Sequence, residues 1–263
     1  NVIGEAFVVV VIGGMGSVPG AFLASVLIGE LNAFGILVFP EITLVLAFLV
    51  MAVVLIVRPW GLLGRPDAVL RGASGPPEEP LRLFTPLSRN LILGLMGLLV
   101  VAPFIADEFT VVLLTDILIF TLFAVSLHFI MGPGGLVSFG HAAYFGLGAY
   151  GAALMVKYLG IGMISGLVVA PVVAGIGALI FGWFCVRLSG VYLAMLTLAA
   201  AQITWSIAFQ WQDVTGGDDG ILGIWPAEWA SDKMAYYYLT LLLVIGGIYF
   251  IRRVVYEIGR AHV

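Results

Sequence analysis

The chain has very little charge. Asp, Glu, Lys and Arg make up 10% of its 263 residues, and hydrophobic residues make up 62%. About a quarter of the residues of a typical soluble protein are charged, so this chain has too few to cover a water-soluble surface. The one cysteine, Cys185, excludes an internal disulfide. The composition therefore excludes a soluble domain, a disordered chain and a disulfide scaffold, and it predicts an integral membrane protein.

The sequence also lacks the motifs of the common nucleotide, metal and redox sites. Its two lysines, Lys157 and Lys233, stand in VKY and DKM, so neither belongs to a phosphate-binding loop that ends in Lys-Ser or Lys-Thr. The string GGMGSVPG has Pro19 where a dinucleotide loop needs its third glycine. The three histidines show no HExxH spacing, and a net charge of -4 gives no basic surface for nucleic acid. We therefore expect no catalytic residues, no metal and no cofactor.

Long runs without charge predict the membrane segments, because about 20 apolar residues span the hydrocarbon layer as a helix. Pro133 and four glycines in MGPGGLVSFG interrupt the longest run. The sequence predicts an all-α polytopic membrane protein with about eight membrane-spanning or membrane-embedded helices. Residues 1–12 are predicted to be the end of a further helix that precedes them. The predicted helices lie near 18–36, 42–57, 91–107, 110–130, 141–158, 161–185, 191–209 and 235–251.

One segment differs from the rest. Residues 58–90 hold six of the twelve prolines and eight charges, five of them arginine, which predicts a linker outside the membrane. By the positive-inside rule the linker is cytoplasmic, and threading the helices from it puts nine of the eleven basic residues on the same side. Loop 210–233 then lies on the opposite, periplasmic side of the membrane.

Two helices carry small residues at every fourth position, a spacing that lets helix backbones approach closely in lipid. The stripes are Gly166, Ala170, Ala174, Ala178 and Gly182, and Ala21, Ser25, Gly29 and Ala33. They indicate helix seams. Whether such a seam slides during function or is purely structural stays open.

Polar residues inside the spans are candidates for function, because they are costly to place in lipid. Glu30, Asp116, Gln202 and Thr204 qualify, and each either faces a translocation path or bonds to another helix. His141 follows the glycine-rich break, where unwound backbone can line a polar cavity, although a packed histidine at a helix start is the simpler interpretation. In the outer loop, TGGDDG (215–220) is either a partner-docking or ligand site or a simple turn among tryptophans of the interfacial belt.

These strings together resemble the permease subunits of ABC importers for branched-chain amino acids. GGLVSFGHAAYFGLGAYGAAL (134–154), SGVYLAMLTLA (189–199) and TGGDDGI (215–221) are similar to the M-type permease. EAFVVVVIGGMGSVPGAFLASVLIGELNAFG (5–35) and RPWGLLG (58–64) are similar to the end of the H-type permease. The resemblance implies a fused permease in two partial bundles. Residues 1–57 form the end of an H-type domain, 58–90 the linker and 91–257 the start of an M-type domain.

The resemblance further implies a multi-pass protein of the bacterial inner membrane that works with two cytoplasmic ABC ATPase subunits and a periplasmic amino-acid-binding protein. ATP hydrolysis belongs to those ATPases, so the chain is not expected to be an enzyme. A related permease for urea, amides or sugars, and a channel independent of ATP, remain alternatives. The expected substrate-path residues are Asp116, Gly134, Gly135, Ser138, His141, Tyr144 and Gln202. The expected docking residues for the binding protein are Thr215, Gly216, Gly217, Asp218 and Asp219.

Both ends of the chain carry expectations of their own. The chain opens inside a hydrophobic stretch without a methionine, which indicates a truncated first helix. The final IGRAHV (258–263) equals one translated frame of a common sequencing adapter, so we interpret it as a possible artefact and assign it no chemistry.

Overall fold

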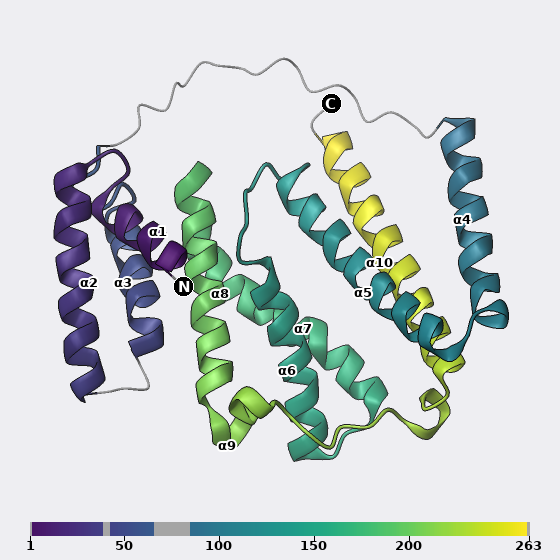
Figure 1. Ribbon diagram of the computed structural model, residues 1–263. Coiled ribbons are helices and arrows are strands. Elements are labelled where there is room, and N and C mark those ends of the chain that lie inside the picture. Colours follow the sequence, from purple (N-terminus) through teal and green to yellow (C-terminus); the bar gives the residue numbers. More distant parts are fainter. Residues whose placement is uncertain (1, 39–42, 66–84, 262–263) are drawn as a thin grey trace. The chain divides into compact units, whose positions relative to one another are not determined.

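A computed structural model describes residues 2–38, 43–65 and 85–261 of the chain (Figure 1). The described residues form helices and contain no strand, which confirms the all-α prediction. The longer helices are α1 (Val2–Gly13), α2 (Val18–Val38), α3 (Thr43–Val57), α4 (Pro86–Ile105), α5 (Glu108–Met131), α6 (His141–Leu159), α7 (Met163–Cys185), α8 (Gly190–Gln210) and α10 (Lys233–Ala261). Short helices α9 (Gln212–Thr215), η2 (Gly217–Asp219) and η3 (Glu228–Ala230) lie in the loop between α8 and α10. Six helices, α2, α4, α5, α7, α8 and most of α10, are long and apolar enough to cross a membrane.

Two boundaries differ from the sequence prediction. Helix α4 begins at Pro86, five residues early, because Thr85 caps it: its Oγ1 accepts the Ser88 N–H at 3.3 Å, and proline suits the first turn. Helix α10 runs on to Ala261 instead of ending near residue 251, so Arg252 and Arg253 are helical. The centre of the predicted linker, 66–84, lies outside the described residues.

The contacts divide the chain into two compact units. Unit 1 consists of residues 1–68 and 135–224, and unit 2 consists of 69–134 and 225–263. Both units are discontinuous in sequence, and unit 1 takes residues from either side of the predicted linker. The division of the chain at 58–90 into two permease pieces remains a prediction.

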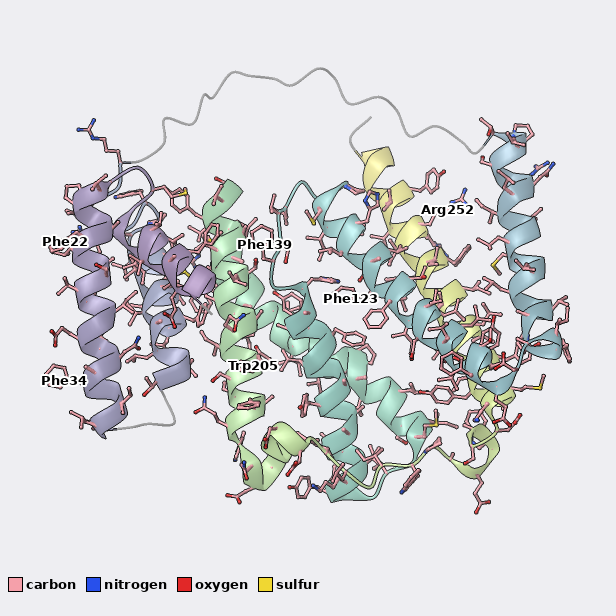
Figure 2. The ribbon with its side chains drawn as sticks, viewed as in Figure 1. Phe22, Phe34, Phe123, Phe139, Trp205 and Arg252 are labelled. Atoms are coloured by element: carbon pink, nitrogen blue, oxygen red, sulfur yellow. The ribbon has the colours of Figure 1, made fainter. Side chains whose placement is uncertain are left out.

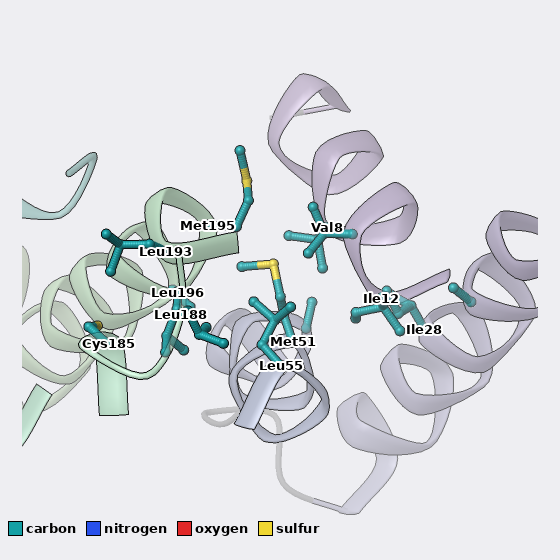
Figure 3. Close-up of a cluster of buried hydrophobic side chains, with 14 residues drawn as sticks. Val8, Ile12, Ile28, Met51, Leu55, Cys185, Leu188, Leu193, Met195 and Leu196 are labelled. Carbon is teal, nitrogen blue, oxygen red and sulfur yellow. The ribbon is translucent and has the colours of Figure 1, made fainter. Parts of the chain in front are cut away.

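The core of unit 1 joins the first three helices to α8 (Figure 3). Met51 and Leu55 of α3 are fully buried between Ile12 of α1 and Leu193 and Leu196 of α8. Lipid is as apolar as these side chains, so their close packing contributes dispersion contacts and shape rather than a hydrophobic driving force. The helices on the two sides of the predicted linker therefore share one packed core.

A glycine cluster closes one end of unit 1. The backbone of the segment after α3 bonds to the end of α1, with Leu62 N–H donating to Ile12 O at 2.8 Å and Leu63 N–H donating to Gly13 O at 3.0 Å. Gly61 has φ 79°, and a Cβ added there would lie 2.6 Å from the Gly14 backbone. The strings GGMGSVPG and RPWGLLG thus pack on each other, and residues 58–64 are part of the fold rather than a free linker.

Helices α6 and α7 form the most extensive helix pair of unit 1. A Cβ added at Gly148 would lie 3.2 Å from Ala170 O and 3.6 Å from the Ala174 Cβ. The small-residue stripe of α7 therefore packs against α6, as its spacing predicts. The stripe of α2 is different: from Ser25 onward it stays exposed, and Gly29 has nothing within 4 Å of an added Cβ.

Unit 2 packs α10 against α5 around Tyr237, Leu241 and Val244. The phenol of Tyr237 is fully buried and donates to Leu99 O in α4 at 2.8 Å. Leu99 stands four residues before Pro103, which has no N–H, so the tyrosine supplies the hydrogen bond that this carbonyl lacks. At the N-terminal ends of α10 and α5, Lys233 forms an exposed ion pair with Glu108.

Candidate functional site

The glycine-rich break lies between α5 and α6, as the sequence predicts. Gly132 N–H donates to His128 O at 2.7 Å and ends α5, and Gly135 has φ 61°, a conformation that favours glycine. Residues 135–140 belong to unit 1 and carry the chain to the start of α6 as a non-helical loop. Non-helical backbone of this kind is tolerated at membrane depth only where protein or water satisfies its polar groups.

Thr197 of α8 satisfies part of that backbone. Its Oγ1 accepts the Phe139 N–H at 3.0 Å and donates to Ala194 O at 2.7 Å. A Cβ added at Gly140 would lie 2.0 Å from Thr197 O, so only glycine permits this approach. Both residues are buried. The loop is therefore fixed directly against the middle of α8.

The start of α6 brings several predicted site residues together. Ser138 is buried at 8% exposure, and His141 is the first residue of α6. The ring of Tyr144 meets that of His141 edge-on, with centroids 6.2 Å apart. The N-terminus of a helix carries partial positive charge, so this region combines a helix dipole with a hydroxyl, an imidazole and a phenol. Such a set can hydrogen-bond a carboxylate, but it has no nucleophile paired with a base.

Of the remaining predicted path residues, Gly134 directly precedes Gly135 in the break, and the other two lie elsewhere. Gln202 is half-buried on α8, about 140° around the helix and about 7.5 Å along it from Thr197, so it does not face the loop. Asp116 and Gly134 belong to unit 2. Asp116 is exposed on α5, away from the buried face of Val111, Thr115 and Leu118. The structure thus gathers Ser138, His141 and Tyr144 at the start of α6, whereas Gln202 points in another direction and Asp116 belongs to unit 2.

Sequence reasoning did not single out Thr197. It lies inside SGVYLAMLTLA, where a single threonine among apolar residues is a weak signal, since threonine often bonds only to its own helix. Gly140 was an indirect signal for this contact, because a glycine directly before a helix often marks a close approach to another backbone segment. Only the fold pairs these two residues, which are 57 positions apart in the chain.

The loop between α8 and α10 is organised around Thr215. This side chain is buried, and its Oγ1 lies 2.6 Å from Ala208 O and 2.7 Å from Trp211 O, at the end of α8. Gly216 and Gly217 follow with φ 78° and 60°, and a Cβ on Gly216 would lie 2.0 Å from Gly220 O. TGGDDG is therefore a tight turn, as its simpler interpretation predicts.

Asp218 and Asp219 project from that turn and are exposed. The turn is held in place from α6, because the Tyr158 phenol donates to Asp213 O at 3.0 Å. The described residues contain no group of three metal-ligating side chains. The arrangement presents two carboxylates on a fixed backbone, which suits contact with a partner surface. Whether these residues dock a binding protein remains a prediction.

When the chain is compared with known protein families, the second half of the chain matches one of them. The family described as "Branched-chain amino acid transport system / permease component" matches residues 109–260. These residues include the glycine-rich break, all of α6 to α9 and the TGGDDG turn. No solved structure matches the chain.

Three characterised permeases are similar to parts of the chain. The high-affinity branched-chain amino acid transport system permease protein LivM of Escherichia coli (strain K12) is 31% identical over 130 residues, which is 49% of this chain and 31% of that protein. LivM of Salmonella typhimurium is 33% identical over 132 residues, with the same coverage. BraD of Pseudomonas aeruginosa is 47% identical over 64 residues, 24% of this chain and 21% of that protein. The chain thus spans about a third or less of the length of these relatives.

Proposed function

The chain belongs to the branched-chain amino acid transport system / permease component family, and on that premise we propose that it is part of the membrane-spanning permease of an ABC importer for branched-chain amino acids. The observation that carries the proposal is the family match over residues 109–260, in a chain with six helices suited to span a membrane. Relatives named as permeases for these amino acids support the substrate class. As a permease, the chain is a transport subunit rather than an enzyme.

The proposed mechanism is alternating access. Two cytoplasmic ATPase subunits bind and hydrolyse ATP, their closure rocks the helix bundles, and a periplasmic binding protein delivers the amino acid. The aliphatic side chain suits an apolar path, while the zwitterion needs polar groups or helix ends. The start of α6, with Gly135, Ser138, His141 and Tyr144, is our candidate for the inner part of that path. Asp116, Gly134 and Gln202 remain candidates on separate grounds.

We place the turn 215–219 on the periplasmic side as a docking surface for the binding protein, and residues 58–90 in the cytoplasm. The two exposed carboxylates and the fixed backbone of the turn support this role.

The membrane orientation can be tested by cysteine labelling, because the sequence has a single cysteine. In a Cys185→Ser background, Asp218→Cys should react with an impermeant maleimide added outside the cell. Leu63→Cys, which is exposed after α3, should react only after permeabilisation. The reverse pattern would overturn the orientation.

The decisive test of function is uptake by the full-length protein in proteoliposomes with both ATPases and the binding protein. Labelled leucine should accumulate only with ATP and the binding protein present. Flux without nucleotide would instead identify a channel. Uptake of urea, an amide or a sugar, but not leucine, would identify the related permease class.

We also propose that the chain joins an H-type end (1–57) to an M-type start (91–257) in one reading frame. The resemblance of residues 5–35 and 58–64 to the H-type permease supports this, as does the shared core of α3 and α8. Sequencing of the complete gene from genomic DNA tests it. One frame that continues through residues 58–90 is expected, whereas a stop codon between the two pieces would refute the fusion.

A further inference from the structure

Helix α2 carries a carboxylate near the middle of its length. Glu30 lies about 18 Å along a helix of about 31 Å, close to the centre of a hydrocarbon layer about 30 Å thick. In the six described spans, Glu30 and Asp116 are the two acidic residues more than one turn from a helix end. Neither α1 nor α3, which pack on α2, contains a lysine or arginine. The carboxylate therefore has no basic partner on its neighbouring helices.

Glu30 also points away from the packed face of its helix. Gly20, Ala24 and Ile28 are buried within unit 1, whereas Glu30 is exposed and lies about 120° around the helix from the centre of that face. No hydrogen bond or ion pair among the described residues involves its carboxylate. Phe22 and Phe34 lie on the same outer side of α2 (Figure 2).

Lipid is not a suitable environment for this face. Ionisable side chains at mid-membrane almost always face a protein interior or a water-filled path. The exposed stripe of Ser25, Gly29 and Ala33 permits a further helix to approach α2 closely. Glu30 lies about 100° around the helix from Gly29, beyond the stripe rather than on it. The carboxylate thus stands beside the exposed stripe, on a side of α2 that no described helix covers.

We propose that Glu30 binds the ammonium group of the transported amino acid midway through the membrane. This inference rests on the proposed function, which supplies a substrate with one ammonium group and an aliphatic side chain. A carboxylate and an ammonium are complementary in charge, and a charge-assisted hydrogen bond between them is among the stronger polar contacts. The apolar surface of Val26 and Phe34 next to Glu30 suits the aliphatic side chain.

The test uses the full-length permease with its ATPases and binding protein. Glu30→Gln keeps the size and hydrogen bonding of the side chain but removes its charge. We expect leucine uptake to fall about tenfold to a hundredfold, the range for losing one charge-assisted hydrogen bond. Glu30→Asp should retain part of the uptake. Glu5→Gln makes the same chemical change at an exposed site in the first turn of α1 and should leave uptake unchanged.

A binding measurement separates substrate recognition from a structural role. The purified wild-type permease should bind leucine better than 4-methylpentanoate, which lacks the ammonium group, and Glu30→Gln should lose that preference while still assembling with its ATPases. Wild-type uptake by Glu30→Gln, or a preference for leucine that survives the substitution, would overturn the inference. Failure of Glu30→Gln to assemble would also overturn it, in favour of a bond between helices. Absence of uptake by the wild-type protein would instead refute the proposed function.

Discussion

The bond between Tyr237 and Leu99 can be tested through the proline that makes it necessary. Tyr237→Phe preserves the ring in its buried position and removes only the hydroxyl that donates to Leu99 O. Because Pro103 has no N–H, nothing in α4 replaces that donor. Pro103→Ala restores the N–H at the position from which a helix normally bonds this carbonyl. The two substitutions should therefore interact.

The magnitude follows from the cost of a buried acceptor that loses its donor. In soluble proteins that cost is about 1–3 kcal/mol, and interhelical hydrogen bonds in a bilayer average about 0.6 and reach about 1.7 kcal/mol. We expect Tyr237→Phe to lower the free energy of unfolding by about 1–1.5 kcal/mol in the native background, and by less than about 0.5 kcal/mol beside Pro103→Ala. The coupling energy is then about 1 kcal/mol.

The neighbouring tyrosine provides a matched control. Tyr238 OH donates to Val100 O at 2.7 Å, but the helical donor for that carbonyl, the N–H of residue 104, is present in the sequence. Tyr238→Phe should therefore have a smaller effect that does not depend on residue 103. The assay is unfolding of the purified protein in mixed micelles by titration with SDS. Equal destabilisation by Tyr237→Phe with and without Pro103→Ala would refute the argument.

Three further predictions concern the loops. Gly140→Ala should destabilise the protein by about 1–3 kcal/mol in the same assay, because the added Cβ would meet the backbone of Thr197. Gly146→Ala, which adds a Cβ in open space on α6, should instead stabilise the protein by about 0.5–1 kcal/mol. Similar effects of the two substitutions would contradict the packing of loop 135–140 against α8. Thr215→Val should cost about 1–3 kcal/mol, since it removes a buried hydroxyl, and an unchanged melting temperature would show that the turn does not need it. The Thr110 hydroxyl donates to Asp107 and lowers the pKa of that exposed carboxyl. Thr110→Ala should therefore raise this pKa in an NMR titration, and it should remove a contribution to stability that is present at neutral pH and lost as the pH falls through the lowered pKa.

The membrane helices could be predicted closely from the sequence, because the signal for each is local. A run of about 20 apolar residues without charge has few alternatives in lipid, where the backbone must bond within its own segment. The exceptions occur at caps and at helix ends. Thr85 and Pro86 start α4 early through a local cap, and α10 continues past Arg252 because arginine side chains can reach the interface while the backbone stays helical.

The candidate site was predictable only in part. Ser138, His141 and Tyr144 lie within a few residues of one another at a glycine-rich break, so their grouping follows from local sequence. Gln202 was a candidate because it is polar inside a span, but its direction depends on how α8 is rotated against its neighbours. Thr197 was missed for the same reason. Packing of one helix on another fixes such rotations, and no pattern within a single helix reveals them.

Composition and spacing by themselves determined that this chain is a helical membrane protein, where its helices lie and which family it resembles. The helices form because exposing polar backbone groups to lipid is costly, and each segment avoids this cost by forming hydrogen bonds within itself. The tertiary structure decided which faces of those helices are covered. It packed the stripe of α7 against α6, left the similar stripe of α2 exposed beside Glu30, and joined α3 to α8 in one core. Lipid does not favour one apolar face over another, so only the fit between particular side chains makes that choice.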